Sequence, residues 1–157
     1  MDSIGVELAT SEDILQINEI SKSHWEEDGD YDYNTLKKII EQGYSFCLKN
    51  KEEVLAFCLI EIRKDLCEIY LIAVKKGYTG KGYGKAILGY SISNARCDGY
   101  TSFKLHTSVT NIIAINLYSK FGFVITREKL KYYKTSKEED NDAYVMELND
   151  SNTITLS

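Results

Sequence analysis

The chain has 157 residues, of which 43% are hydrophobic, and a formal net charge of −5. That length suits one folded domain, which we assign to residues 1–149, followed by a polar tail at 150–157. The excess of acid argues against a nucleic-acid partner, and no apolar stretch is long enough to span a membrane. The N-terminus lacks the basic region and apolar run of a signal peptide, so we expect a cytoplasmic protein without membrane association.

Hydrophobic periodicity predicts a mixed order of strands and helices along the chain. Strands are expected at 5–9, 45–49, 54–63, 66–74, 103–107, 123–133 and 143–148. Helices are expected at 10–24, 34–42, 83–98 and 111–121. An acidic, aromatic loop joins the first two helices, and a polar stretch joins the last two strands. This order predicts a single α/β domain without internal repeats.

A glycine-rich loop follows the strand at 66–74 and leads directly into the helix at 83–98. Gly80, Gly82 and Gly84 let the backbone adopt positive φ and approach a ligand closely. The first amides of the helix have no partner within it, so they form a site for an anion, usually a phosphate. The charges around the loop are all positive, from Lys75, Lys76, Lys81 and Lys85.

Two common phosphate-binding motifs do not fit this loop. The Walker motif needs Ser or Thr after its lysine, but Gly82 follows Lys81 and Ala86 follows Lys85. The dinucleotide fingerprint needs a third glycine where Lys85 stands. A glycine-rich turn that binds nothing is the alternative interpretation.

The loop resembles the coenzyme A pyrophosphate loop of the GNAT acyltransferase superfamily, which reads Arg/Gln-x-x-Gly-x-Gly/Ala after a strand. Here the run is Thr79-Gly-Lys-Gly-Tyr-Gly84. The segment from Asn111 to Phe123 is similar to the second signature of the family, Asn-x-x-Ala-x-x-Leu-Tyr-x-x-x-Gly-Phe. Within it, Asn111 and Tyr118 occupy one face of the expected helix, two turns apart. The signatures occur in the family's order, and the resemblance covers residues 4–148.

The resemblance implies a fold and a cosubstrate. The fold is a mostly antiparallel, seven-stranded sheet in which the fourth and fifth strands run parallel and splay apart, with about four helices. The cosubstrate is acetyl-CoA, whose pantetheine arm lies between the splayed strands. The implied cofactor-binding residues are Ile72, Ala73, Val74, Thr79, Gly80, Lys81, Gly82, Tyr83, Gly84, Lys85, Asn111 and Tyr118. Thr79 replaces the usual Arg or Gln, so we expect weaker coenzyme binding rather than none.

The implied chemistry is acyl transfer from a thioester to a primary amine by direct attack. Glu68 is the candidate base, because it is the one charged residue in a near-continuous apolar run and resembles the general base of the histone-acetyltransferase branch. Glu61 on the neighbouring strand is the fallback. Tyr118 is the candidate acid for the departing thiolate. Cys67 is a weak candidate nucleophile, since nothing basic adjoins it in sequence; the alternative for the cysteines is reduced core thiols.

The acceptor is less well determined. In this family the loop between the first two helices and the loop between the last two strands border the acceptor site. Both loops are acidic here, which favours a cationic amine, from a small molecule or a peptide, over a merely solvated acidic surface. The acidic residues are Glu26, Glu27, Asp28, Asp30, Asp32, Glu138, Glu139, Asp140 and Asp142.

Other interpretations stay open. His106 could reach the acceptor site from the fifth strand or be a satisfied strand histidine, and the two histidines give no metal motif. A non-catalytic acyl-CoA sensor or scaffold with the same fold is the alternative function, and an unrelated nucleotide-binding domain is a third. We expect a monomer or a homodimer.

Overall fold

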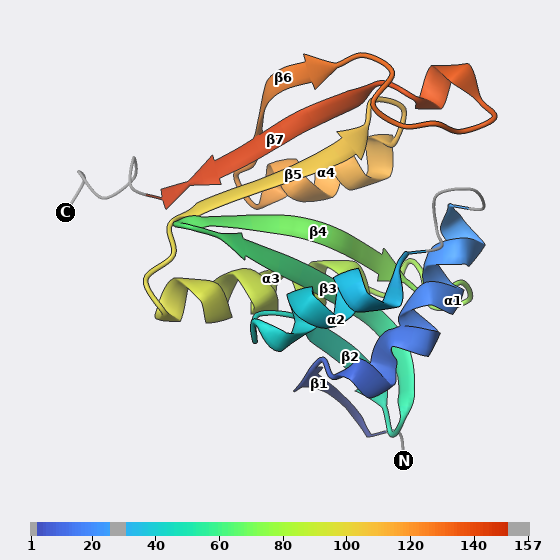
Figure 1. The fold of residues 1–157 in the computed structure, drawn as a ribbon, viewed down its shortest axis with the longest axis vertical. Helices are drawn as coiled ribbons and strands as arrows, with labels where there is room; N and C mark the ends of the chain where they lie inside the picture. Colours follow the sequence, from blue (N-terminus) through green and yellow to red (C-terminus); the bar gives the residue numbers. More distant parts are fainter. Residues whose placement is uncertain (1–2, 26–30, 151–157) are drawn as a thin grey trace.

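The computed structural model of the chain describes residues 3–25 and 31–150. Seven strands form one sheet in the order β1-β2-β3-β4-β5-β7-β6 (Figure 1). They are β1 (Ile4–Leu8), β2 (Phe46–Asn50), β3 (Glu53–Arg63), β4 (Leu66–Val74), β5 (Ser102–Ser108), β6 (Val124–Lys129) and β7 (Ala143–Asn149). Every neighbouring pair is antiparallel except β4 and β5, which run parallel. The predicted mixed α/β sheet with one parallel pair is confirmed.

Four α-helices cover the two faces of the sheet. They are α1 (Ile14–His24), α2 (Tyr33–Glu41), α3 (Tyr83–Cys97) and α4 (Ile112–Lys120), and short 3-10 turns stand at η1 (Ser11–Asp13) and η2 (Glu138–Asp140). Helices α1 and α2 pack on one face, whereas α3 and α4 pack on the other (Figure 1). The sheet therefore separates two buried apolar layers.

A β-bulge in β4 changes which layer its side chains enter. Leu59 of β3 pairs with Leu71, but the next residue, Ile60, pairs with Ile69, so Tyr70 is the extra residue. Ile69 packs in the layer under α3, and Leu71 packs in the layer under α1 and α2. In a regular strand residues two apart share a face, so the bulge is what switches them. It lies beside Glu68, where the strand leaves its parallel neighbour.

The start of α1 is held by polar contacts with the sheet. Asp13 accepts a hydrogen bond from the amide of Thr10 at 2.9 Å and pairs with Lys49 at 2.7 Å. Gln16 accepts a hydrogen bond from the amide of Val54 at 2.9 Å and donates to the carbonyl of Glu52 at 2.9 Å. Helix α1 is thus fixed against β2 and β3.

One predicted boundary differs from the structure by more than one residue. The strand predicted at 123–133 ends at Lys129, because Lys131 adopts a left-handed φ of 53° and donates its amide to Asp142 at 2.8 Å. At the other end, Asn149 belongs to β7, and Asp150 donates its amide to the carbonyl of Thr101 at 2.8 Å. Asp150 also pairs with Arg96, so the first residue assigned to the tail is tied to the domain.

The sequence left reduced core thiols as one interpretation of the cysteines, and it contains no apolar stretch long enough to span a membrane. All four cysteines are free, and Cys47, Cys58 and Cys67 are buried while Cys97 is exposed. Among the residues that the structure describes, no helix has the length and apolar character needed to cross a membrane.

Candidate active site

The parallel strands β4 and β5 stay paired only over their first halves. Pairing runs from Leu66 with Ser102 to Ile69 with Leu105, and beyond that point the strands diverge (Figure 1). The amide of Lys75 donates to the carbonyl of Leu55 in β3 at 2.8 Å. Because backbone groups alternate along a strand, those of Ile72 and Val74 face the opposite way, toward β5. The diverging half of β4 therefore presents a strand edge to an extended ligand.

The glycine-rich loop continues from that edge into α3. Gly82 is the N-cap of α3 with a φ of 85°, and no side chain caps the helix. The first helical hydrogen bond is donated by the amide of Ala86 to Gly82 at 3.0 Å. The preceding amides, of Tyr83, Gly84 and Lys85, consequently have no acceptor in the helix. Free amides at the start of a helix are the arrangement that the sequence predicts for an anion site.

The glycines of the loop differ from the prediction in one respect. Positive φ occurs at Gly77, Gly80 and Gly82, at 93°, 79° and 85°, whereas Gly84 is an ordinary helical residue. The expectation of positive φ at Gly84 is wrong. A Cβ there would lie 3.5 Å from the Val74 side chain and 3.8 Å from Leu117, so glycine instead lets α3 begin close to β4 and α4.

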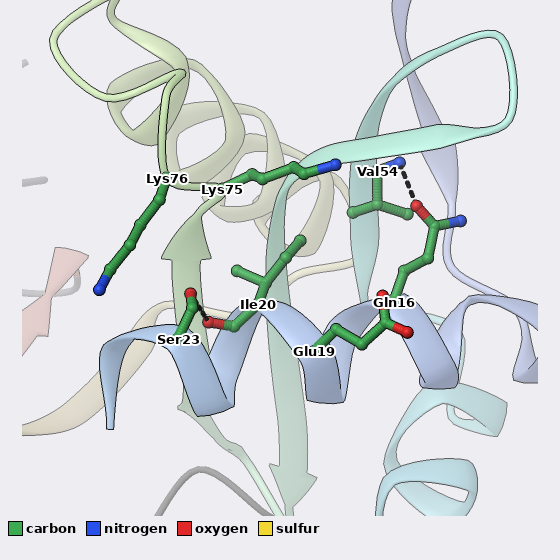
Figure 2. A pocket seen from close by; sticks show the side chains of 7 residues that line it. All are labelled: Gln16, Glu19, Ile20, Ser23, Val54, Lys75 and Lys76. Carbon is green, nitrogen blue, oxygen red and sulfur yellow. Dashed lines mark hydrogen bonds between the residues drawn. The ribbon is translucent and has the colours of Figure 1, made fainter. Parts of the chain in front are cut away.

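The four lysines around the loop do not all point into it. Lys75 pairs with Glu53 at 2.6 Å and is drawn toward the start of β3. Lys75 and Lys76 line a cavity between α1 and β3 together with Gln16, Glu19, Ile20, Ser23 and Val54 (Figure 2). The volume of this cavity is about 160 Å³. Lys81 lies over the ring of Tyr78 at 5.6 Å, and Thr79 is exposed. The backbone amides, rather than a cage of lysines, are the main feature of the anion site.

Glu68 lies where β4 and β5 begin to part. Its side chain is largely buried, with 14% exposed, and its Oε2 is 3.7 Å from Nδ1 of His106 on β5. Its Oε1 is 3.8 Å from Nε of Arg63. Glu61 is held by Arg63 at 3.0 Å, so the fallback base is already engaged by a cation. Of the two carboxylates, Glu68 is the one beside the histidine.

Tyr118 approaches the same region from the opposite face of the sheet. It packs in the layer under α3, and its ring makes an edge contact with Phe123 at 6.1 Å. Burial, and secondarily the nearby Cys58, raises the pKa of Tyr118, so the phenol keeps its proton. Asn111 caps α4 by accepting a hydrogen bond from the amide of Ala114 at 3.3 Å. The predicted base and acid thus stand on two sides of the diverging strands.

Three residues near Glu68 were not singled out from the sequence. Tyr132 stacks on His106, with ring centroids 4.5 Å apart and planes 4° from parallel. Lys129 places its Nζ 3.1 Å from Nε2 of His106. Arg63 contributes the contact to Glu68 described above. No local pattern marks these residues, because β6 reaches β5 only through β7 in the strand order.

A second histidine meets the edge of β4. Nε2 of His24, at the end of α1, is 2.5 Å from the carbonyl of Val74 and donates to it. This is the backbone carbonyl that alternation directs toward the diverging strands. The sequence analysis assigned His24 only to the end of a helix, and the contact could not be anticipated without knowing where α1 packs.

Cys67 does not suit a nucleophile. Its side chain is buried under α3, and burial raises the pKa of the thiol to about 12. It therefore remains a protonated thiol at neutral pH. The described residues also contain no cluster of three or more histidine, cysteine or carboxylate groups suited to a metal ion.

Only some of the acidic residues that were expected to border the acceptor site lie within the described residues. Glu26, Glu27, Asp28 and Asp30 lie outside the described residues. Asp32 caps α2 by accepting from the amide of Thr35 at 3.0 Å. Asp140 accepts from the hydroxyl of Thr110 at 2.5 Å. Asp32 and Asp140 are thus engaged in local hydrogen bonds, while the charges that lower the pKa of His106 are the cations of Arg63, Lys104, Arg127 and Lys129.

Comparisons with known proteins agree with this geometry. The model of the acetyltransferase (GNAT) family matches residues 11–123. The [ribosomal protein bS18]-alanine N-acetyltransferase of Escherichia coli K12 is 29% identical over 108 residues, which cover 69% of this chain and 72% of that enzyme. The mycothiol acetyltransferase of Renibacterium salmoninarum is 22% identical over 142 residues, and the match spans 83% of this chain but only 42% of that protein.

A solved structure shares the whole fold. Arabidopsis thaliana Naa50, in complex with the bisubstrate analogue CoA-Ac-MVNAL, superposes with a TM-score of 0.78 at 20% identity, and the match covers 92% of this chain and 97% of Naa50. At that identity the likeness shows the fold alone.

Proposed function

The chain belongs to the acetyltransferase (GNAT) family, and we propose that it transfers the acetyl group of acetyl-CoA to the α-amine of a peptide or protein N-terminus. Family membership makes it an acyl-CoA-dependent N-acetyltransferase with acetyl-CoA as cosubstrate. The observation that carries the proposal is the placement of Glu68 and Tyr118 on two sides of the point where β4 and β5 diverge.

The coenzyme would enter from the side of α3. Its pyrophosphate would bind the amides between Thr79 and Lys85, including those of Tyr83 and Gly84 at the start of α3. Its pantetheine arm would lie along Ile72 to Val74 like an added strand. The Val74 carbonyl already accepts from His24, and its second lone pair would serve the arm.

The acceptor amine would enter from the side of α1 and α2. Glu68 removes a proton from the ammonium group, and the free amine attacks the thioester carbonyl. The amide of Ile72, which faces the diverging strands, donates to the oxyanion, whereas that of Leu71 faces β3. The C–S bond breaks as the C–N bond forms, and Tyr118 donates its proton to the leaving thiolate. No covalent enzyme intermediate is required, in keeping with the buried Cys67 thiol.

The choice of a single α-amine over a polycation rests on charge and on the relatives. Lys104, Arg127 and Lys129 act on His106 at the acceptor side, and they would repel an acceptor with several positive groups. The Escherichia coli relative is named for a protein alanine, and the Naa50 ligand carries a peptide. Tyr31, whose ring meets Tyr70 at 6.0 Å, and Tyr132 offer aromatic surface on this side for the first residues of a peptide.

Thiol release from acetyl-CoA across an amine panel tests the proposed acceptor. The panel contains peptides with different first residues, the same peptides with blocked N-termini, a polyamine and an aminoglycoside. We expect release only with free peptide N-termini. Release with the polyamine alone would overturn the acceptor class. Coenzyme binding without release from any amine would favour the non-catalytic acyl-CoA module.

Replacing Tyr118 with phenylalanine should slow transfer about tenfold to a hundredfold, because the leaving thiolate loses its donor. Among the described residues none hydrogen-bonds the Tyr118 hydroxyl, so the free energy of unfolding should change by less than about 1 kcal/mol. Tyr44→Phe is the matched control, since the Tyr44 hydroxyl donates to Asp98 at 2.6 Å away from the site. Steady-state kinetics in which both variants behave alike would remove Tyr118 as the acid.

A further inference from the structure

We propose that Lys129 is a positioning residue of the acceptor site, which holds His106 neutral with its ring proton on Nδ1, facing Glu68. The inference rests on the proposed function for its catalytic meaning, but its structural part can be measured without any turnover. Lys129 touches neither of the reacting groups and acts through the imidazole.

The hydrogen-bond partner of His106 determines which tautomer the ring adopts. Nζ of Lys129 lies 3.1 Å from Nε2 of His106, and an ammonium group can only donate. Nε2 must therefore carry the lone pair, and the proton of the neutral ring must be on Nδ1. Nδ1 lies 3.7 Å from Oε2 of Glu68, so the ring turns an N–H toward the proposed base.

The ring of His106 is also fixed in orientation. Tyr132 stacks on it at 4.5 Å with planes 4° apart, and the ammonium group of Lys129 lies 5.2 Å from the centre of the same Tyr132 ring. Lys129 thus contacts both members of the stack. A half-turn of the imidazole about its Cβ–Cγ bond would put Cε1 where Nε2 lies and would give up the contact with Lys129.

The charges around His106 keep it neutral. Glu68 faces it from β4 and Arg63 acts from β3, while Lys104 lies on its own strand and Arg127 and Lys129 on β6. On β7 its partner is Val145, and Glu147 pairs with Lys104. Burial first, and then these cations, with Lys129 the strongest, lower the pKa of His106 from 6.5 to about 4.

A neutral His106 matters for the chemistry of Glu68. An imidazolium 3.7 Å from the carboxylate would pair with it and make it a weaker proton acceptor. The neutral ring instead faces Glu68 with an N–H at 3.7 Å, and it leaves the carboxylate without a cationic imidazole partner when the substrate ammonium arrives. Lys129 accordingly protects the basicity of Glu68 as the pH falls.

Replacing Lys129 with methionine tests this role. Without the cation the pKa of His106 should rise, although burial and the remaining cations still lower it, so kcat/KM at pH 5.5 should fall by up to about threefold relative to its value at pH 8, beyond any fall in the unmodified protein. Lys129→Arg keeps a charged donor and should restore the unmodified ratio. Addition of His106→Gln to Lys129→Met should remove the extra dependence on pH. An unchanged profile in Lys129→Met would overturn the proposal.

Nitrogen NMR of histidine-labelled protein gives a readout that needs no acceptor. The chain has only two histidines, so a His24→Gln variant assigns the signals. We expect His106 to show the Nδ1–H tautomer and no titration between pH 5.5 and 8, and to titrate at a clearly higher pH in Lys129→Met than in the unmodified protein. A His106 that carries its proton on Nε2, or that titrates near pH 6.5 in the unmodified protein, would overturn the proposal. The expected spectra without acetyl transfer would contradict only the proposed function.

Discussion

Replacing Gly82 with valine is expected to abolish measurable binding of acetyl-CoA. Gly82 has a φ of 85° and caps α3, so a β-branched residue would strain the backbone that directs the amides of Tyr83 and Gly84 at the pyrophosphate. Loss of two charge-assisted hydrogen bonds, at about 1.5 kcal/mol each, would weaken binding by more than about a hundredfold. Isothermal titration of the variant with acetyl-CoA measures the effect.

The other end of the same helix supplies the control for backbone strain. Gly99 follows α3 with a φ of 95°, and an added Cβ would meet nothing within 4 Å at either glycine. Gly99→Val should therefore lose comparable stability in thermal unfolding while its affinity for acetyl-CoA stays unchanged. Normal affinity in Gly82→Val, or equal loss in both variants, would contradict the assignment of the pyrophosphate loop.

The second large effect is expected for Glu68→Gln. The amide cannot accept the proton of the substrate ammonium, so the rate of transfer should fall by about a hundredfold or more. Gln is close in size to Glu, and Glu68 lies on the face opposite to α3, so the affinity for acetyl-CoA should be largely retained. The rate loss should be smallest at high pH, where free amine is already abundant. Transfer rates measured from pH 6 to 9 test both points.

Glu61→Gln is the matched control for Glu68→Gln. Glu61 and Glu68 occupy opposite positions on the neighbouring strands β3 and β4, and both lie near Arg63. Each substitution therefore removes one negative charge from the same region. Only Glu68 is beside His106. A rate that is unchanged in Glu68→Gln but lost in Glu61→Gln would transfer the role of base to the fallback residue.

Much of the fold could be predicted because the sequence patterns that indicate it are local. The glycine loop, the Asn111 cap and the alternating strands each depend on a few neighbouring residues. The boundary errors have a different origin. Lys131 turns left-handed to donate to Asp142, and Asp150 donates to Thr101. Both contacts join residues that are more than ten positions apart in the sequence.

The residues of the candidate site also fall into two groups, those within sequence motifs and those that only the fold brings to the site. Glu68, Tyr118 and Gly82 stand in motifs, so the sequence singles them out. Lys129 and Tyr132 can be assigned to the site only when the strand order is known, because β6 lies next to β7 and β7 lies next to β5. The contact of His24 with Val74 likewise needs the packing of α1 against β4. Contacts between distant segments leave no periodic pattern in the chain.

Tandem mass spectrometry of a single peptide product tests the central claim most directly. The substrate would be a peptide with a free N-terminus and one internal lysine, incubated with acetyl-CoA and the purified chain. The proposed site predicts one acetyl group on the α-amine and none on the lysine side chain, and no product with Glu68→Gln in the same time. An acetyl group on the lysine alone, or an unmodified peptide although acetyl-CoA binds, would contradict it.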